Sequence, residues 1–126
     1  MSTRSTIAMK TDEGYLNIYC HFDGYPEHHA PVLKENYNTD EKVLELLELG
    51  DLSCLDENIG EKIDFNDSFT RKENKQCLSY YRDRGENAAM KNKCCIQAVD
   101  CQEYNYLFKD GKWFVSCDDF KNLKEI

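Results

Sequence analysis

The sequence lacks a long hydrophobic run. None of its windows approaches the roughly 18 apolar residues that a helix needs to cross a bilayer. The opening residues, Met-Ser-Thr-Arg-Ser-Thr, also lack the apolar core of a secretory signal. We therefore expect no membrane association, and we expect the protein to stay in the cytoplasm in which it is made.

Motifs that dependably mark metal, nucleotide or redox chemistry are also missing. There is no C-x-x-C pair, no H-E-x-x-H, no Walker loop and no G-x-G-x-x-G. The seven cysteines are odd in number, and Cys94 and Cys95 are adjacent, which suits neither a simple bridge nor a zinc knuckle. Reduced thiols acting as small apolar side chains are the better interpretation. Cys20 beside His21 suggests a metal or nucleophile site only weakly, because neighbours in a strand diverge. We expect no metal and no cofactor.

Positive charge is in deficit. The sequence contains 16 Lys and Arg residues and 24 Asp and Glu residues, which gives a net charge of −8. This charge disfavours nucleic acid polymers and acidic membrane surfaces as partners. The acidic residues concentrate in residues 40–67, whereas Arg82 and Arg84 lie close together. A small phosphate-bearing ligand is therefore compatible with the local charge, and a long duplex is not.

The patterns that are present predict one α+β domain over residues 1–126. Residues 3–10 and 15–22 alternate as two strands around a turn that contains Gly14, which predicts an antiparallel hairpin. A second hairpin pairs residues 104–108 with 113–117 around an Asp-Gly turn. The predicted fold is an antiparallel sheet built from hairpins with two short helices packed on it.

The helices are expected in the first half of the chain. Residues 27–37 favour a helix that Pro31 either begins or splits. A clearer helix starts at Asn38 or Thr39 as cap and ends at Gly50. Residues 51–71 are expected to form an irregular acidic excursion anchored by scattered apolar residues. Strands are expected over 77–82 and 95–99, with a loop or short helix over 85–93 between them. The tail over 118–126 is expected to form a helical turn.

The first candidate site follows the first hairpin. Tyr19, His21, Phe22, Asp23 and Tyr25 cluster where the strand ends. One interpretation is a pocket whose rings stack on a base or sugar while Asp23 accepts hydrogen bonds from hydroxyls. The alternative is a sheet face and a turn, with Asp-Gly chosen for backbone geometry. The residues alone leave both open.

The second candidate is Arg82-Asp83-Arg84-Gly85-Glu86. Strand alternation would place both arginines on one face, where two guanidinium groups can clamp a diphosphate. The alternative is a solvated ion-pair network, which contributes little and is favoured without other information. The first hairpin also brings Arg4 beside His21 and Phe22, which makes it a third candidate cation.

Several segments together resemble a family of small phage proteins, the first Thoeris anti-defence family. They are Arg4-Ser5-Thr6-Ile7, residues 18–26 (Ile-Tyr-Cys-His-Phe-Asp-Gly-Tyr-Pro), Glu41-Lys42-Val43, residues 49–53, residues 80–86 and residues 103–113. The match covers most of the chain in order and omits the acidic stretch near residues 56–75. The resemblance implies a sponge in the infected host's cytoplasm that binds cyclic ADP-ribose isomers without degrading them. It also implies a homodimer or larger assembly with shared pockets, and in some members a separate site for cyclic oligonucleotides.

The resemblance implies that residues of the two candidate sites together form one ligand-binding site. We expect Tyr19, His21, Phe22 and Tyr25 to shape the pocket, and Asp23 to serve a ribose or a turn. The cations expected to hold phosphate are Arg4, Arg82 and Arg84, and Tyr81 from the same motif joins the set. No catalytic residue is expected.

Two rival functions are weighed against the sponge. In the first, residues 40–67 form an acidic surface that inhibits a basic host protein. In the second, Asp23, Asp83 and Glu86 hold a divalent metal in a nucleotide hydrolase. We rank the sponge first and the hydrolase last.

Overall fold

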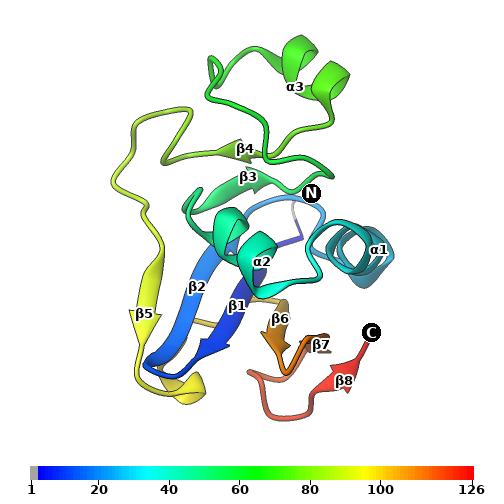
Figure 1. Ribbon diagram of the computed structural model, residues 1–126, viewed down its shortest axis with the longest axis vertical. Coiled ribbons are helices and arrows are strands. Elements are labelled where there is room, and N and C mark those ends of the chain that lie inside the picture. The colour runs from blue at the N-terminus through cyan, green and yellow to red at the C-terminus, as the bar shows by residue number, and fades with distance from the viewer. Residues whose placement is uncertain (1–2) are drawn as a thin grey trace.

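The computed structural model describes residues 3–126, which form an eight-stranded sheet and three helices (Figure 1). The strands are β1 (Ser5–Thr11), β2 (Gly14–Cys20), β3 (Leu52–Cys54), β4 (Leu78–Ser79), β5 (Lys91–Lys93), β6 (Tyr104–Lys109), β7 (Lys112–Ser116) and β8 (Lys124–Glu125). The helices are α1 (Pro26–Asn36), α2 (Asp40–Leu47) and α3 (Ser68–Asn74), with a 3-10 turn η1 (Ile96–Ala98). In this part of the chain no helix has both the length and the apolar character that crossing a membrane requires.

The sheet is mixed but mostly antiparallel. Its order is β4-β3-β2-β1-β6-β7-β8, and β5 pairs with the beginning of β2. The predicted α+β class is confirmed, and both predicted hairpins are present as β1–β2 and β6–β7. The connection between them differs from a simple series of hairpins, because β1 pairs parallel with β6 and β2 pairs parallel with β3.

The β6–β7 turn follows the sequence signal closely. Asp110 and Gly111 have φ values of 53° and 74°, so both central residues are left-handed. Two positive φ angles are what a two-residue turn needs to match the twist of the flanking strands, and an Asp-Gly pair adopts them at low cost. This local geometry sets the register that places Phe108 opposite Trp113.

The sheet has a core on each face. Helices α1 and α2 cover one face (Figure 1), where Ile7 and Ile18 pack with Leu33, Val43 and other buried side chains. The opposite face, here called the rear face, carries a smaller core made by Ala8 and Leu107 with Val99 and Phe120. The alternating residues of β1 and β2 therefore divide between a fully covered face and a partly open one.

Helix α2 begins and ends much as expected. Thr39, one of the two predicted caps, accepts a hydrogen bond at Oγ1 from the Lys42 N–H (3.2 Å). The side chains of Val43, Leu46 and Leu47 are buried, and each contributes roughly 1.5–3 kcal/mol of hydrophobic stabilisation.

The prediction that Pro31 starts or splits a helix is wrong. Helix α1 is continuous, with Pro26 in its first turn and Pro31 in its interior. Pro31 lacks the N–H that would reach the Glu27 carbonyl, a loss that costs a helix about 3 kcal/mol. Burial of His29 and Leu33 on either side of Pro31 holds the helix together in spite of it.

Residues 77–82 do not form the predicted strand. Only Leu78–Ser79 pairs, because Ser79 Oγ accepts hydrogen bonds from the N–H groups of Tyr81 (3.1 Å) and Arg82 (3.0 Å) and turns the chain away from the sheet. Residues 80–84 are consequently a run of turns. Strand alternation therefore does not apply to the two arginines.

Four other local predictions need correction. The segment over 85–93, expected to be a loop or short helix, ends in β5. Residues 95–99 contain η1 in place of a strand, since the Val99 N–H bonds back to the Ile96 carbonyl. The tail forms β8 against β7 where a helical turn was expected. The excursion over 51–71 contains β3 and the start of α3, and Phe69 is no anchor, because it is 74% exposed.

Candidate functional site

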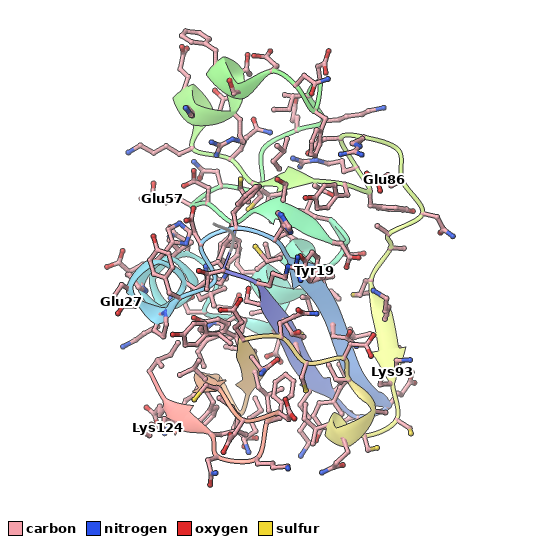
Figure 2. The ribbon with its side chains drawn as sticks, turned by 180° about the vertical axis from the view of Figure 1, so that it is seen from behind. Tyr19, Glu27, Glu57, Glu86, Lys93 and Lys124 are labelled. Carbon is pink, nitrogen blue, oxygen red and sulfur yellow. The ribbon has the colours of Figure 1, made fainter. Side chains whose placement is uncertain are left out.

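A polar pocket opens on the rear face of the sheet, with a volume of about 220 Å³. Figure 2 views this face, with Tyr19 near its centre and the chain running from Glu86 to Lys93 along one side. The residues that line it come from β1 and β2, from β5 and from two loops: Thr6, Asn17, Ile18, Tyr19, Asp51, Lys91, Asp100 and Gln102. We call this cavity the rear-face pocket.

Strand register places Tyr19 at this pocket, and two further predicted aromatic residues contact Tyr19 or its neighbour. Thr6 pairs with Tyr19, and directly paired residues share a face. Two residues further along, the side chain of His21 meets that of Tyr19, with the Tyr19 hydroxyl and His21 Nδ1 2.6 Å apart in a hydrogen bond. Phe22 packs edge-on against the His21 ring at 4.5 Å between centroids. Tyr19, His21 and Phe22 thus form one contiguous aromatic rim.

Burial and the nearby charge of Arg4 act in opposite directions on the pKa of Tyr19. Burial raises the pKa of the Tyr19 hydroxyl, and the positive charge of Arg4 opposes that shift. Arg4 precedes β1 on the exposed surface, one residue before the Ser5–Cys20 pair, and therefore lies at the His21 end of the hairpin. The prediction that the hairpin brings Arg4 to the aromatic residues agrees with this placement.

Asp51 connects the strands and loops around the pocket. Its Oδ1 accepts a hydrogen bond from the Tyr19 N–H (2.9 Å), and its Oδ2 lies 3.5 Å from Lys91 Nζ. Its own backbone accepts from the Tyr80 N–H (2.9 Å) and donates to the Ala88 carbonyl (2.8 Å). Through its carboxylate and its backbone, Asp51 therefore holds β2, β5 and the segments at Tyr80 and Ala88 together beside the pocket.

The far wall of the pocket is the segment that crosses the rear face after η1. Thr6 Oγ1 donates to the Asp100 carbonyl (2.8 Å), and the Gln102 N–H donates to Asn105 Oδ1 (2.9 Å). These bonds position a carboxylate and an amide side chain at the rim of the pocket. The carboxylate can accept hydrogen bonds from sugar hydroxyls, and the amide can accept or donate them.

Arg84 belongs to an aromatic stack near this site. Its guanidinium carbon lies 5.0 Å from the centroid of Phe65 and 5.6 Å from that of Tyr80, and the two rings stack at 5.4 Å. Its Nε also bonds to Glu86 (2.8 Å), and the side chain is half exposed. The Tyr80 N–H donates to the Asp51 carbonyl (2.9 Å), so the stack is joined through its backbone to a residue that lines the pocket.

Arg82, in contrast, points into the protein. Its guanidinium makes two bonds to Asp83 (2.9 and 3.2 Å) and others to the carbonyls of Ile59 (2.7 Å), Gly60 (3.3 Å) and Cys77 (3.1 Å). Asp83 is buried and also accepts from the backbone of Ser79. The two arginines therefore do not form one clamp. The solvated ion pair expected as the alternative describes Arg84 and Glu86, whereas the pair between Arg82 and Asp83 is largely buried.

The other predicted residues lie apart from these contacts. Asp23 adopts a left-handed φ of 58° in the turn after β2. Tyr25 precedes α1 and packs edge-on against His28, and it is 38% exposed. Tyr81 is 45% exposed, and its Cβ would lie 2.7 Å from a Cβ added at Gly50. Among residues 3–126, no ring contact or side-chain hydrogen bond joins Tyr25 or Tyr81 to the aromatic rim.

The residues proposed for hydrolysis are also dispersed. Asp83 is committed to Arg82, Glu86 pairs with Arg84, and Asp23 occupies its own turn. Among residues 3–126 there is no group of three or more His, Cys, Asp or Glu side chains suited to hold a metal ion. Cys20 is buried and its pKa is raised by that burial, which makes it a poor nucleophile.

Sequence reasoning missed most of the pocket lining. Strand alternation from Tyr19 could have found Thr6 and Asn17, because they share its face. Asp51, Lys91 and Asp100 carry no local signal, since they reach the pocket only through contacts between segments far apart in the sequence.

Comparison with known proteins adds no assignment: the chain matches no protein-family model, no curated protein and no solved structure. The resemblance to the Thoeris anti-defence family therefore stays a prediction that rests on the segments quoted above. The function has to be argued from the rear-face pocket and its rim.

Proposed function

We propose that this protein is a sponge that binds a small cyclic nucleotide of the ADP-ribose type and sequesters it without cleaving it. The observation that carries the proposal is the convergence of the Tyr19–His21–Phe22 rim, the charge of Arg4 and the rear-face pocket. The sequence resemblance supports the same ligand class. Sequestration in the host cytoplasm would keep the messenger from its effector.

The groups at the site match the parts of such a ligand. Rings at the rim offer stacking surfaces for adenine, at roughly 1–3 kcal/mol per base. Arg4 offers a guanidinium to the pyrophosphate, and Arg84 beside the rim adds a second. Asp100 and Gln102 offer polar groups to ribose hydroxyls. Effective sequestration needs submicromolar affinity, about 8 kcal/mol or more, which a few such contacts can supply.

The size of the pocket favours an assembly. Its 220 Å³ is below the roughly 300 Å³ at which cavities for small-molecule ligands begin, so one subunit encloses only part of such a ligand. We therefore propose a homodimer or larger oligomer in which a second subunit completes the enclosure. Light scattering on the purified protein with and without ligand tests this part.

Calorimetry with a panel of cyclic ADP-ribose isomers and cyclic di- and trinucleotides tests the function. We expect submicromolar binding of a cyclic ADP-ribose isomer, and recovery of intact ligand after the protein is denatured by heat. Altered ligand would indicate an enzyme instead. Tyr19→Ala should weaken binding about tenfold or more, whereas Lys10→Ala, a charge change elsewhere on the same hairpin, should not.

An acidic inhibitor is the second candidate, favoured by one observation. Helix α2 exposes Asp40, Glu41, Glu45 and Glu48 together on the surface. Reversing two of these charges, Glu45→Lys and Glu48→Lys, would abolish an inhibitory complex and leave nucleotide binding intact. If reversal abolishes anti-defence activity while Tyr19→Ala leaves it intact, the inhibitor replaces the sponge.

A further inference from the structure

We propose that Cys94 and Cys95 form a redox-active dithiol that closes to a vicinal disulfide with peroxide and thereby alters the wall of the rear-face pocket. The two thiols are both exposed, and their Sγ atoms lie 4.0 Å apart. They follow β5 directly and precede η1. The effect on the pocket rests on the proposed function, whereas closure of the dithiol does not.

Cys20, Cys77 and Cys101 are less suited to react. Cys20 and Cys77 are buried, and burial raises the pKa of Cys77 to about 11. Cys101 is half-buried, with its Sγ directed to the Val99 carbonyl at 3.5 Å. Its pKa is also raised by burial and by Asp119. Adjacent exposed thiols therefore have each other as the nearest reaction partner.

The chemistry balances with a peroxide as oxidant. The thiolate of one cysteine attacks a peroxide oxygen, forming a sulfenic acid and releasing one water after protonation. The second thiol attacks that sulfur, the S–S bond forms, and a second water leaves. Two electrons pass from the two sulfurs to one hydrogen peroxide, so two thiols and one peroxide yield one disulfide and two waters.

Closing this ring strains the backbone. Neighbouring Cα atoms are about 3.8 Å apart, below the roughly 4.4–6.8 Å that an unstrained disulfide spans. The peptide between Cys94 and Cys95 must distort to bring the sulfurs together. A strained, exposed disulfide is readily reduced again, which makes the pair reversible.

The strain falls on a segment whose two ends line the pocket. Lys91 on one side pairs with Asp51, and Asp100 on the other side is held by Thr6. The end of β5 is tied to the start of β2, because Lys93 pairs with Tyr15 and its carbonyl occupies the space that a Cβ at Gly14 would need. Distortion at the dithiol is therefore passed to β5 and to Lys91.

The first experiment tests the dithiol without any nucleotide. The full chain carrying Cys101→Ser is reduced, treated with hydrogen peroxide and labelled with maleimide, and its tryptic peptides are weighed. We expect the peptide that begins at Cys94 to lose two hydrogens and to take no label, and a dithiol reductant to restore both sites. Further replacement with Cys94→Ser or Cys95→Ser should abolish the loss. Full labelling after peroxide, or a bridge to Cys117 or to another chain, overturns the proposal.

The second experiment measures whether oxidation of the dithiol changes β5, which forms one wall of the rear-face pocket. Hydrogen exchange on the same Cys101→Ser protein should become faster at the amides of β5 after oxidation and recover on reduction, and unchanged exchange overturns the coupling. Nucleotide affinity should then fall about threefold or more. If no nucleotide binds the reduced protein, the proposed function fails, and the mass and exchange measurements still decide the dithiol.

Discussion

The first hairpin and the turn over residues 80–86 look alike in sequence, since each combines aromatic rings, a carboxylate and arginine. In the structure they differ. At the hairpin, Arg4 is exposed and acts on Tyr19 only through its charge. At the turn, Arg82 makes five hydrogen bonds to its own chain. An arginine with all its donors engaged inside the protein has little left to offer a ligand.

Arg84 lies between these extremes. It has one carboxylate partner and two aromatic rings, and its side chain is 53% exposed. Its guanidinium edge can still meet solvent or a ligand. The comparison therefore predicts that neighbouring arginines of one motif divide into a structural residue and a binding residue, and the experiments below test that division.

The largest expected effect is that of Arg82→Ala on stability. The change leaves the Asp83 carboxylate buried without its counter-ion and removes donors from three carbonyls. Breaking one partner of a buried ion pair costs roughly 3–5 kcal/mol. Urea unfolding followed by circular dichroism should show this loss in the free energy of unfolding.

Arg84→Ala is the matched control. Its ion pair with Glu86 is exposed and its ring contacts are partly solvated, so the cost should be no more than about 1.5 kcal/mol. Equal losses for the two variants would show that the distinction between the arginines is mistaken.

The sequence was most informative where structure is local. Alternation and turn residues predicted both hairpins, because Ile7, Ile18 and the Asp-Gly pair at 110–111 each specify geometry within a few residues. The caps of α2 and the position of Arg4 beside the first hairpin follow from the same short-range rules. These rules also brought Tyr19, His21 and Phe22 together correctly.

The sequence was least informative where one distant contact decides the conformation. Ser79 Oγ turns the chain after two strand residues, and that hydroxyl also bonds to the Leu49 carbonyl thirty residues away. Pro31 stays in a helix because tertiary packing outweighs its local cost. The pocket residues Asp51, Lys91 and Asp100 meet for the same non-local reason, so no periodicity could have predicted them.

The next prediction concerns His29, which lies beneath the first hairpin. It is fully buried, with Nε2 3.0 Å from Ser5 Oγ, and burial, assisted by the charge of His28, lowers its pKa from 6.5 to about 3. Between pH 6.5 and about 3, the His29 side chain is therefore protonated in the unfolded chain and neutral in the folded protein. Stability from this group is full above pH 6.5 and falls by about 1.4 kcal/mol per unit as pH drops toward 3.

His29→Gln should remove this dependence. Free energies of unfolding measured between about pH 6 and 4.5, above most carboxylate titration, should show a steep slope for the natural protein and a shallow one for the variant. If His29→Gln keeps the steep dependence of unfolding free energy on pH, a group other than His29 takes up the proton on unfolding.

Arg4→Ala should change binding more than folding. Because Arg4 is exposed, its loss should leave the free energy of unfolding within about 0.5 kcal/mol. Loss of its bond to a phosphate should weaken nucleotide affinity about tenfold, or about 1.4 kcal/mol. Calorimetry on Arg4→Ala and Arg82→Ala, the latter at a temperature where it is folded, separates the two roles. Stronger loss in folded Arg82→Ala would reverse the assignment.

The smallest effect is expected at Asp23, where the sequence left a turn and a ribose contact open. Its φ of 58° is left-handed, a conformation that costs most L-residues about 1–2 kcal/mol and glycine almost nothing. If geometry is its role, Asp23→Gly should keep stability within about 1 kcal/mol, and Asp23→Ala should be less stable than Asp23→Gly by about 1 kcal/mol. Both variants should bind nucleotide as tightly as the natural protein does. A loss of affinity shared by both variants, without that difference in stability, would place the carboxylate on the ligand and extend the binding site along the turn.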